Sequence, residues 1–259
     1  MNSKIIINSS VAFIVASLLE MTLHEAGHFS AAFLLGYHPV LHHNYVAYGE
    51  IPQRDHIITA MAGPLVSLCI GILFHILLNA GKLRGMNALV ALYFSIFGYI
   101  GFLGYVMIAP FFSYGDTGYV LNALGCPMWM MVVLALIAVI VFYFLSKTWA
   151  IHFIGLMNKQ TATDFQQRKR FIYSVVLFPL FIGIAITTLL NLPVPTTLSL
   201  IAPLTSPYVI LWAFGAYLRK EGNYFDEKQQ IASKIYVNWI FIFLVVVIVN
   251  RLLVAGFQA

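Results

Sequence analysis

Two histidines and a glutamate inside an apolar stretch have the types and spacing that chemistry needs. His24 and His28 are four residues apart, and Glu25 directly follows the first of them. On a helix this spacing places both rings on one face, one turn apart, where they can bind the same metal ion. Glu25 then lies within reach of a water molecule on that ion. The arrangement is the HExxH pattern of zinc metallohydrolases.

The surroundings make this pattern unusual, because residues 11–36 are otherwise almost wholly apolar. An ionisable group in hydrocarbon costs on the order of a few kcal/mol on insertion scales. Four such groups fall between Glu20 and His28, in a chain of which only 9% is charged. A bound divalent cation would offset that cost. The competing interpretation is a polar patch that hydrogen-bonds to neighbouring helices.

The composition indicates the class of protein. Of the 259 residues 61% are hydrophobic, and the mean hydropathy of +0.89 is far from that of soluble domains. We therefore expect an all-α polytopic membrane protein, with residues 1–259 forming a single membrane-embedded domain. The net charge of +5 does not indicate nucleic-acid binding, because the basic residues lie in short loops between apolar runs. Cys69 and Cys126 have no spacing typical of a disulfide framework or a metal site.

Crossing a bilayer takes about 20 apolar residues, and the sequence predicts about seven such spans. Six is the alternative, because Pro203 and Pro207 interrupt the sixth span and indicate a broken or partly re-entrant helix. The first span carries the HExxH pattern, so we expect the chain to retain it rather than lose it as a signal peptide. The predicted spans are roughly residues 10–36, 56–80, 87–111, 128–146, 171–190, 196–218 and 235–256.

The connection between the first two spans, residues 37–55, has a composition of its own. It combines aromatic and β-branched residues with Gly49 and Pro52. This pattern predicts a short strand or hairpin near the membrane surface, and an interfacial loop anchored by tyrosines also fits it. The same connection contains three further histidines, His38, His42 and His43.

Asp116 is the candidate for a third metal ligand. It is the only acidic residue between Asp55 and Asp164, and glycines on both sides permit an irregular backbone. Taken alone, Asp116 would be interpreted as a cap of the helix that follows it. A site with two histidines needs one more protein ligand, and a carboxylate is a normal choice for zinc. We therefore expect His24, His28 and Asp116 to bind Zn²⁺.

Three segments together resemble the site-2 protease family of intramembrane zinc metalloproteases. They are HEAGH at residues 24–28, Ala-Gly-Pro at 62–64 and Gly-Asp at 115–116. The resemblance covers roughly residues 10–122 and implies a catalytic core there, with residues 123–259 as additional transmembrane helices. It implies that Glu25 is the general base. Ser67 stands where the family usually has an asparagine.

The expected activity is hydrolysis of peptide bonds in membrane-associated or transmembrane substrates, within or at the edge of a cell membrane. Glu25 would take a proton from zinc-activated water and deliver it to the leaving amine. By analogy with the family, the 37–55 segment would hold an unwound substrate strand by edge pairing. The expected partners are a membrane protein or peptide substrate and the lipid bilayer, with no nucleic acid. Glu20 would either orient the His24 ring or bond to a neighbouring helix.

The distribution of Lys and Arg predicts an orientation. In a seven-span arrangement, the N-terminus and residues 81–86, 147–170 and 219–234 lie on one side and carry 12 of the 14 Lys and Arg. The positive-inside rule places that side in the cytoplasm. Asp116 then lies toward the opposite side. Members of the resembled family usually open their site toward the cytoplasm, so the chain would be inverted or its first spans would be counted differently.

Two other classes compete with the protease. A membrane di-iron oxidase or hydroxylase would use His24 and His28 as one histidine box and the histidines of residues 38–43 as another. Its third box is missing, and it leaves Glu25 and Asp116 without roles. A metal-binding transporter or non-catalytic scaffold also places ionisable groups in a membrane. The polar residues of this chain, however, cluster in one place and form no path across a bilayer.

Overall fold

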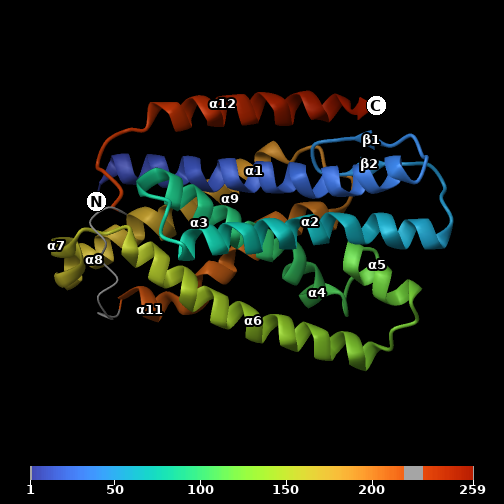
Figure 1. Cartoon of the computed structure of the whole chain (residues 1–259), viewed down its shortest axis with the longest axis horizontal. Helices are drawn as coiled ribbons and strands as arrows, with labels where there is room; N and C mark the ends of the chain where they lie inside the picture. The colour runs from blue at the N-terminus through green and yellow to red at the C-terminus, as the bar shows by residue number, and fades with distance from the viewer. Residues whose placement is uncertain (1, 219–229, 259) are drawn as a thin grey trace.

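The computed structural model describes residues 2–218 and 230–258 and is built almost entirely of helices (Figure 1). Within the described residues, six helices are long and apolar enough to cross a membrane. This confirms the prediction of an all-α polytopic membrane protein. Three of the six spans are single helices, α1 (Ser3–Leu34), α2 (Gln53–Asn79) and α6 (Met128–Gly155).

The other three long spans are composite. One joins α3 (Gly85–Tyr99), the π-helix η1 (Ile100–Gly104) and α4 (Tyr105–Ile108). Another joins α8 (Phe165–Ile172), the π-helix η2 (Tyr173–Leu177) and α9 (Phe178–Leu190). The last joins α12 (Val237–Leu252) and the short 3₁₀ helix η5 (Leu253–Ala255). The short helix α7 (Lys159–Thr163) lies between α6 and α8.

Within the described residues, the predicted span at residues 196–218 is not one long helix but a broken segment, as its two prolines indicated, so the long helices number six. It consists of α10 (Thr197–Thr205), the 3₁₀ helix η3 (Ser206–Ala213) and α11 (Phe214–Leu218). Pro203 and Pro207 lack the backbone N–H that a continuous helix needs, which accounts for the break. Because α10 packs on α9 and α11 packs on α8, the broken segment runs back along the whole α8–α9 span.

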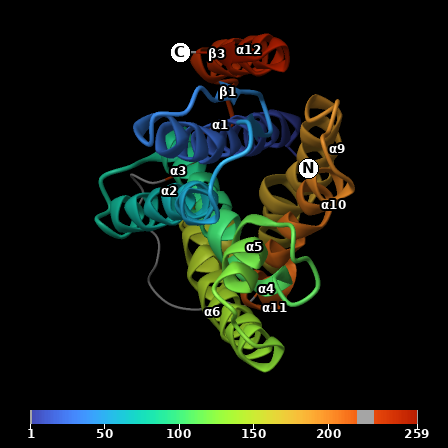
Figure 2. The same cartoon turned by 90° about the vertical axis from the view of Figure 1, so that its right-hand side faces the viewer.

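Helix α1 is the central element of the bundle. It lies between α12 on one side and α2 and α3 on the other, and it also packs against α9 (Figure 2). Its residues from Val11 to Leu18 are buried. By contrast, α6 and α12 expose many large apolar side chains, as expected for helices that contact lipid. The HExxH residues are therefore presented from the best-enclosed helix of the fold.

The 37–55 connection contains the predicted hairpin. Strand β1 (Val40–Leu41) pairs antiparallel with β2 (Val46–Ala47). A third strand that the sequence did not predict, β3 (Phe257–Gln258), follows η5 and pairs with the other side of β1. The strand order is β2-β1-β3, so β2 is an edge strand within the described part of the chain.

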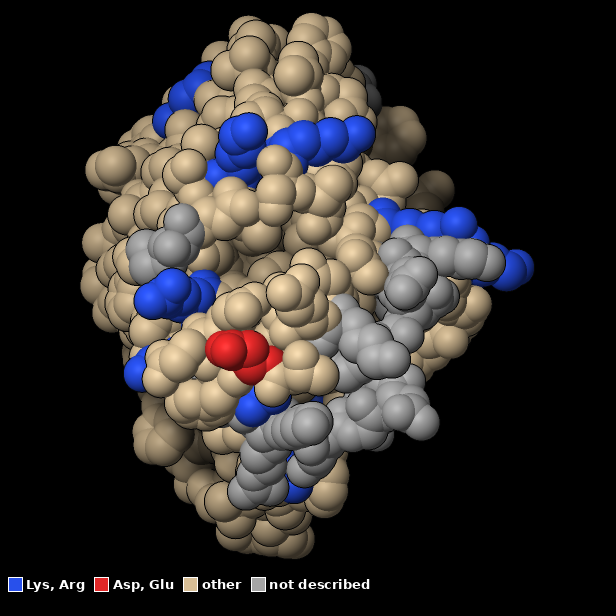
Figure 3. All heavy atoms as spheres, turned by 90° about the vertical axis from the view of Figure 1, so that its left-hand side faces the viewer, with Lys and Arg blue, Asp and Glu red and all other residues tan. Residues whose placement is uncertain are grey.

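The two ends of the bundle differ in charge. Lys and Arg side chains gather on the end at which α1 begins, and acidic side chains are sparse in that view (Figure 3). The hairpin and α5 (Asp116–Ala123) lie at the opposite end (Figure 1). The HExxH part of α1 belongs to that second end.

Candidate metal centre

Two elements bring the three predicted ligands together. His24 and His28 project from α1, and Asp116 is the first residue of α5. The Nε2 atom of His24 lies 3.1 Å from Asp116 Oδ2, and that of His28 lies 3.5 Å from the same oxygen. The two Nε2 atoms are 3.1 Å apart. In the described part of the chain, this is the one group of three His, Cys, Asp or Glu side chains close enough to hold a metal ion.

The dimensions of this triangle fit a tetrahedral zinc site. Zinc bonds of about 2.0–2.1 Å at tetrahedral angles place neighbouring ligand atoms about 3.3 Å apart. The three separations of 3.1, 3.1 and 3.5 Å bracket that value. Three protein ligands also leave one coordination position for water or substrate, which is the pattern of catalytic zinc sites.

The hydrogen bonds of the two histidine rings place their protons on Nδ1, which suits binding of a cation by the Nε2 atoms. His28 Nδ1 donates to the carbonyl oxygen of Thr59 at 2.7 Å, because a carbonyl can only accept. His24 Nδ1 lies 2.9 Å from Ser67 Oγ, which donates its own proton elsewhere and therefore accepts from the ring. Both neutral rings then present the lone pair of Nε2 into the same space. Two lone pairs that face each other repel unless a proton or a metal ion lies between them, so this tautomer pair is suited to binding a cation.

Gly63 of α2 provides the space in which the two Nε2 atoms converge. A Cβ atom at this position would clash with His28 Nε2 and lie 2.8 Å from His24 Nε2. Any side chain at position 63 would therefore occupy the space into which the ligand atoms point. The sequence indicated a close helix contact at Ala-Gly-Pro, and the structure adds that its glycine forms a wall of the candidate site.

The position of Asp116 distinguishes the ligand from the helix cap. The N-cap residue of α5 is Gly115, so Asp116 is not the helix cap. The Asp116 carboxylate is directed at the histidines instead. Burial alone would raise the pKa of Asp116, but His28 and His24 hold it well below its usual range. With a side chain that is 25% exposed, Asp116 is the most open of the three candidate ligands. Access to the site is therefore on the α5 side.

Glu25 is buried beside this triangle and is not one of its members. Its carboxylate makes no hydrogen bond to any described residue, although both histidines and Asp116 lie within electrostatic range. A carboxylate without a hydrogen-bond partner at this place is free to accept a proton. This is the property that the sequence pattern predicts for a general base.

Two tyrosines near the site were missed by sequence reasoning. The ring of Tyr105, in α4, stacks on His24 with ring centres 5.6 Å apart. Tyr48 directly follows β2, and burial together with the negative charges of Asp116 and Glu25 raises its pKa to about 12. Its hydroxyl therefore stays protonated and remains a hydrogen-bond donor. No sequence spacing relates either tyrosine to the HExxH pattern, because only the fold brings them close.

The remaining histidines do not join the triangle. His42 Nδ1 lies 3.3 Å from the carbonyl oxygen of Val254, and its ring stacks on Tyr45. His43 Nε2 donates to the carbonyl oxygen of Asn191 at 3.0 Å. The second histidine box of the di-iron interpretation is therefore directed at backbone groups of other segments.

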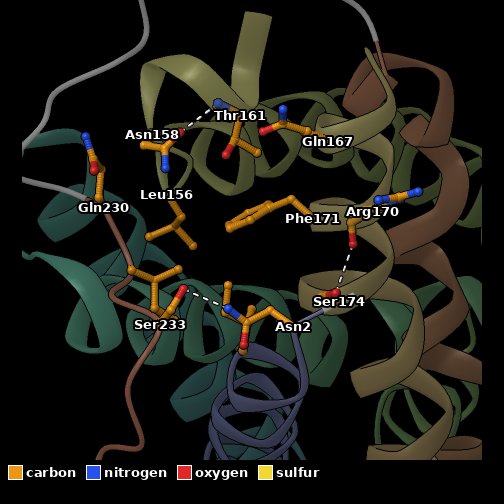
Figure 4. A pocket seen from close by; sticks show the side chains of 12 residues that line it. Asn2, Leu156, Asn158, Thr161, Gln167, Arg170, Phe171, Ser174, Gln230 and Ser233 are labelled. Atoms are coloured by element: carbon orange, nitrogen blue, oxygen red, sulfur yellow. Dashed lines mark hydrogen bonds between the residues drawn. The ribbon is translucent and has the colours of Figure 1, made fainter. Parts of the chain in front are cut away.

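A cavity of about 280 Å³ at the basic end has a different character (Figure 4). Its lining is mainly amide and hydroxyl groups around an apolar floor that includes Phe171, and its one ionisable residue is Arg170. Several of its polar groups are already paired, as in the bond from Asn2 Nδ2 to Ser233 Oγ. The convergence of ionisable groups that marks the triangle is not found among these lining residues.

Comparisons with known proteins add no family to this description. No family model, no curated protein and no solved structure matches the chain. The function must therefore be argued from the geometry of the site and the pattern of the sequence.

Proposed function

We propose that this integral membrane protein is a multi-pass zinc metalloprotease of a cell membrane and a divergent member of the site-2 protease family. Residues 10–122 would contain its catalytic core, and its reaction would be hydrolysis of peptide bonds in membrane-associated or transmembrane substrates. The observation that carries the proposal is the convergence of three ligand atoms from His24, His28 and Asp116 beside the unpaired carboxylate of Glu25.

In the proposed reaction, the metal and the side chains of the protein contribute different chemistry. When bound, zinc supplies Lewis acidity, which lowers the pKa of water to about 7 and polarises a carbonyl group. His24, His28 and Asp116 would hold the ion. Glu25 accepts the proton of the attacking water and returns it to the leaving amine. The Tyr48 hydroxyl, protonated across the physiological range, supplies a donor at the edge of the site.

Substrate binding follows from the edge strand. A transmembrane substrate hides its carbonyl groups in helical hydrogen bonds, so it must unwind locally before hydrolysis. Strand β2 offers an unpaired edge within the described residues, and Tyr48 follows it directly. An extended segment pairing with β2 would be led toward Asp116, the most open ligand.

The side to which the site opens follows from charge. The site lies at the opposite end of the bundle from the Lys and Arg side chains of Figure 3. The positive-inside rule places that basic end in the cytoplasm. The site therefore opens toward the non-cytoplasmic side, which suits processing of exported or membrane-bound peptides.

The proposal is tested by replacing the base and leaving the ligands in place. Purified wild type and Glu25→Gln are reconstituted with a membrane-protein fraction, and newly formed peptide N-termini are profiled by mass spectrometry. We expect cleavage by Glu25→Gln to fall by a factor of about 10²–10⁴, while zinc remains bound. Asp164→Asn, which changes an exposed carboxylate far from the proposed site and substrate segment, is the matched control. Cleavage by Glu25→Gln at the wild-type rate would refute the proposal.

A further inference from the structure

A buried carboxylate one helical turn before the candidate ligands has no role in the proposed reaction. Glu20 is 8% exposed, and no Lys or Arg of the described chain forms an ion pair with it. A carboxylate buried without a cation is costly, so its position requires compensation. Its one hydrogen bond among the described residues comes from Ser67 of α2, whose Oγ donates to Oε1 across 2.5 Å.

Ser67 connects this carboxylate to the metal ligand. A hydroxyl has a single proton, which Ser67 gives to Glu20, so Oγ accepts from His24 Nδ1–H at 2.9 Å. Ser67 is fully buried, so bulk water does not compete for either bond. The chain from ring to hydroxyl ends on the carboxylate of Glu20. Such a chain of hydrogen bonds fixes the tautomer of the His24 ring and makes its Nε2 atom a stronger electron-pair donor to a metal ion.

The span that contains η1 leaves room for the side chains of Glu20 and Ser67. Gly101 lies in the π-helix η1, and a Cβ atom there would lie 2.5 Å from both Glu20 Oε1 and Ser67 Oγ. A side chain at this position would displace the serine or the carboxylate. Single-turn π-helices occur frequently at functional sites. Three spans, α1, α2 and the one containing η1, therefore enclose the two hydrogen bonds.

The two histidines consequently differ as ligands. The Nδ1 proton of His28 goes to a neutral backbone carbonyl, whereas that of His24 goes to a hydroxyl that is itself bonded to a carboxylate. We infer that Glu20 and Ser67 are positioning residues that hold His24 with Nε2 toward the metal and increase the metal affinity of the site. This role rests on the proposed metal centre but requires neither a protease activity nor a particular substrate.

The test measures metal binding directly. Zinc affinity of the purified, full-length protein is determined by competition with a chromogenic chelator for wild type, Ser67→Ala and Glu20→Gln. We expect Ser67→Ala to bind zinc about 10–100-fold more weakly. Glu20→Gln keeps an acceptor and loses the charge, so a smaller loss is expected. Absorption bands of the cobalt-substituted protein should shift in both variants, which a purely structural change elsewhere would not cause.

Ser95→Ala is the matched control, because Ser95 is also fully buried and its hydroxyl has no hydrogen-bond partner among the described residues. Zinc affinity and cobalt spectrum should not change in this variant. If wild type binds zinc and both test variants bind it equally well, the inference is wrong and the proposed function stands. If wild type binds no zinc, the proposed function fails and the inference with it. Should Ser67→Ala fail to fold, Glu20→Gln decides the outcome.

Discussion

Two groups of histidines lie close together in the sequence, but only one of them has the geometry of a metal site. His24 and His28 lie on a helix, donate their Nδ1 protons to fixed acceptors and converge through Nε2. His38 and His42 have the same four-residue spacing but lie around the extended strand β1. The same spacing thus has a different meaning on different backbones, because only a helix places residues four apart on one face.

The second group has a structural role instead. His42 contacts the carbonyl of Val254 near the end of the last span, and His43 contacts the carbonyl of Asn191 just after α9. These bonds tie the hairpin to two distant spans. His43 is at least as well buried as His24 and His28, so burial alone does not distinguish a metal-site histidine.

The largest expected loss of zinc affinity comes from filling the space between the rings of His24 and His28. In Gly63→Ala the new Cβ atom clashes with His28 Nε2, so the ligand atoms are forced apart. We expect zinc affinity to fall at least about 100-fold and peptide cleavage to disappear. Gly104→Ala is the matched control, because the nearest atom to its Cβ would be 3.7 Å away. Zinc binding by Gly63→Ala at wild-type affinity would show that the rings do not bind metal through Nε2.

Removing His42 and His43 should leave the metal in place and weaken the fold. In the double variant His42→Ala, His43→Ala we expect the metal content per chain to remain that of wild type. Stability should fall by about 1 kcal/mol, because the bond from His43 to the carbonyl of Asn191 is lost while that carbonyl keeps its second donor, Asn44. Metal analysis and chemical denaturation measure the two effects separately. Loss of metal from this variant would join the two groups in one site and favour the di-iron enzyme.

The smallest expected effect concerns the ring that stacks on His24. Tyr105→Leu removes the aromatic face and keeps an apolar side chain of similar reach. We expect zinc affinity to weaken less than about tenfold, in line with roughly 0.5–1.5 kcal/mol for an aromatic pair. Chelator competition is sensitive enough to measure this change. A loss as large as that of Gly63→Ala would mean that Tyr105 does more than support the ring.

Most of the fold could be predicted because its signals are local. Apolar runs of spanning length predicted the long helices, and Pro203 and Pro207 indicated the broken one. The hairpin followed from composition, but strand β3 did not, because a two-residue strand forms only where the fold brings it to a partner. The π-helix η1 was missed for the same reason, because its Gly101 is needed only where side chains of α1 and α2 pack against it.

The candidate site likewise has parts that the sequence predicts and parts that only the fold shows. The convergence of His24 and His28 is a property of helix spacing, so a short stretch of sequence predicts it. Asp116 is distant in the chain and was predicted from the need for a third ligand and the scarcity of other acids. The link from Glu20 through Ser67 to His24 joins two helices, and the sequence predicted only that Glu20 would orient the His24 ring or bond to a neighbouring helix, without Ser67.

The metal content per chain tests directly whether His24, His28 and Asp116 bind zinc. Wild type, His24→Ala and Asp116→Ala are purified without chelator and examined by elemental analysis, with the His42→Ala, His43→Ala variant alongside. We expect one zinc per wild-type chain, its loss or weakening in both ligand variants, and its retention in the double variant. Two irons per chain would contradict this expectation in favour of an oxidase, and no metal in any sample would leave only a non-catalytic scaffold.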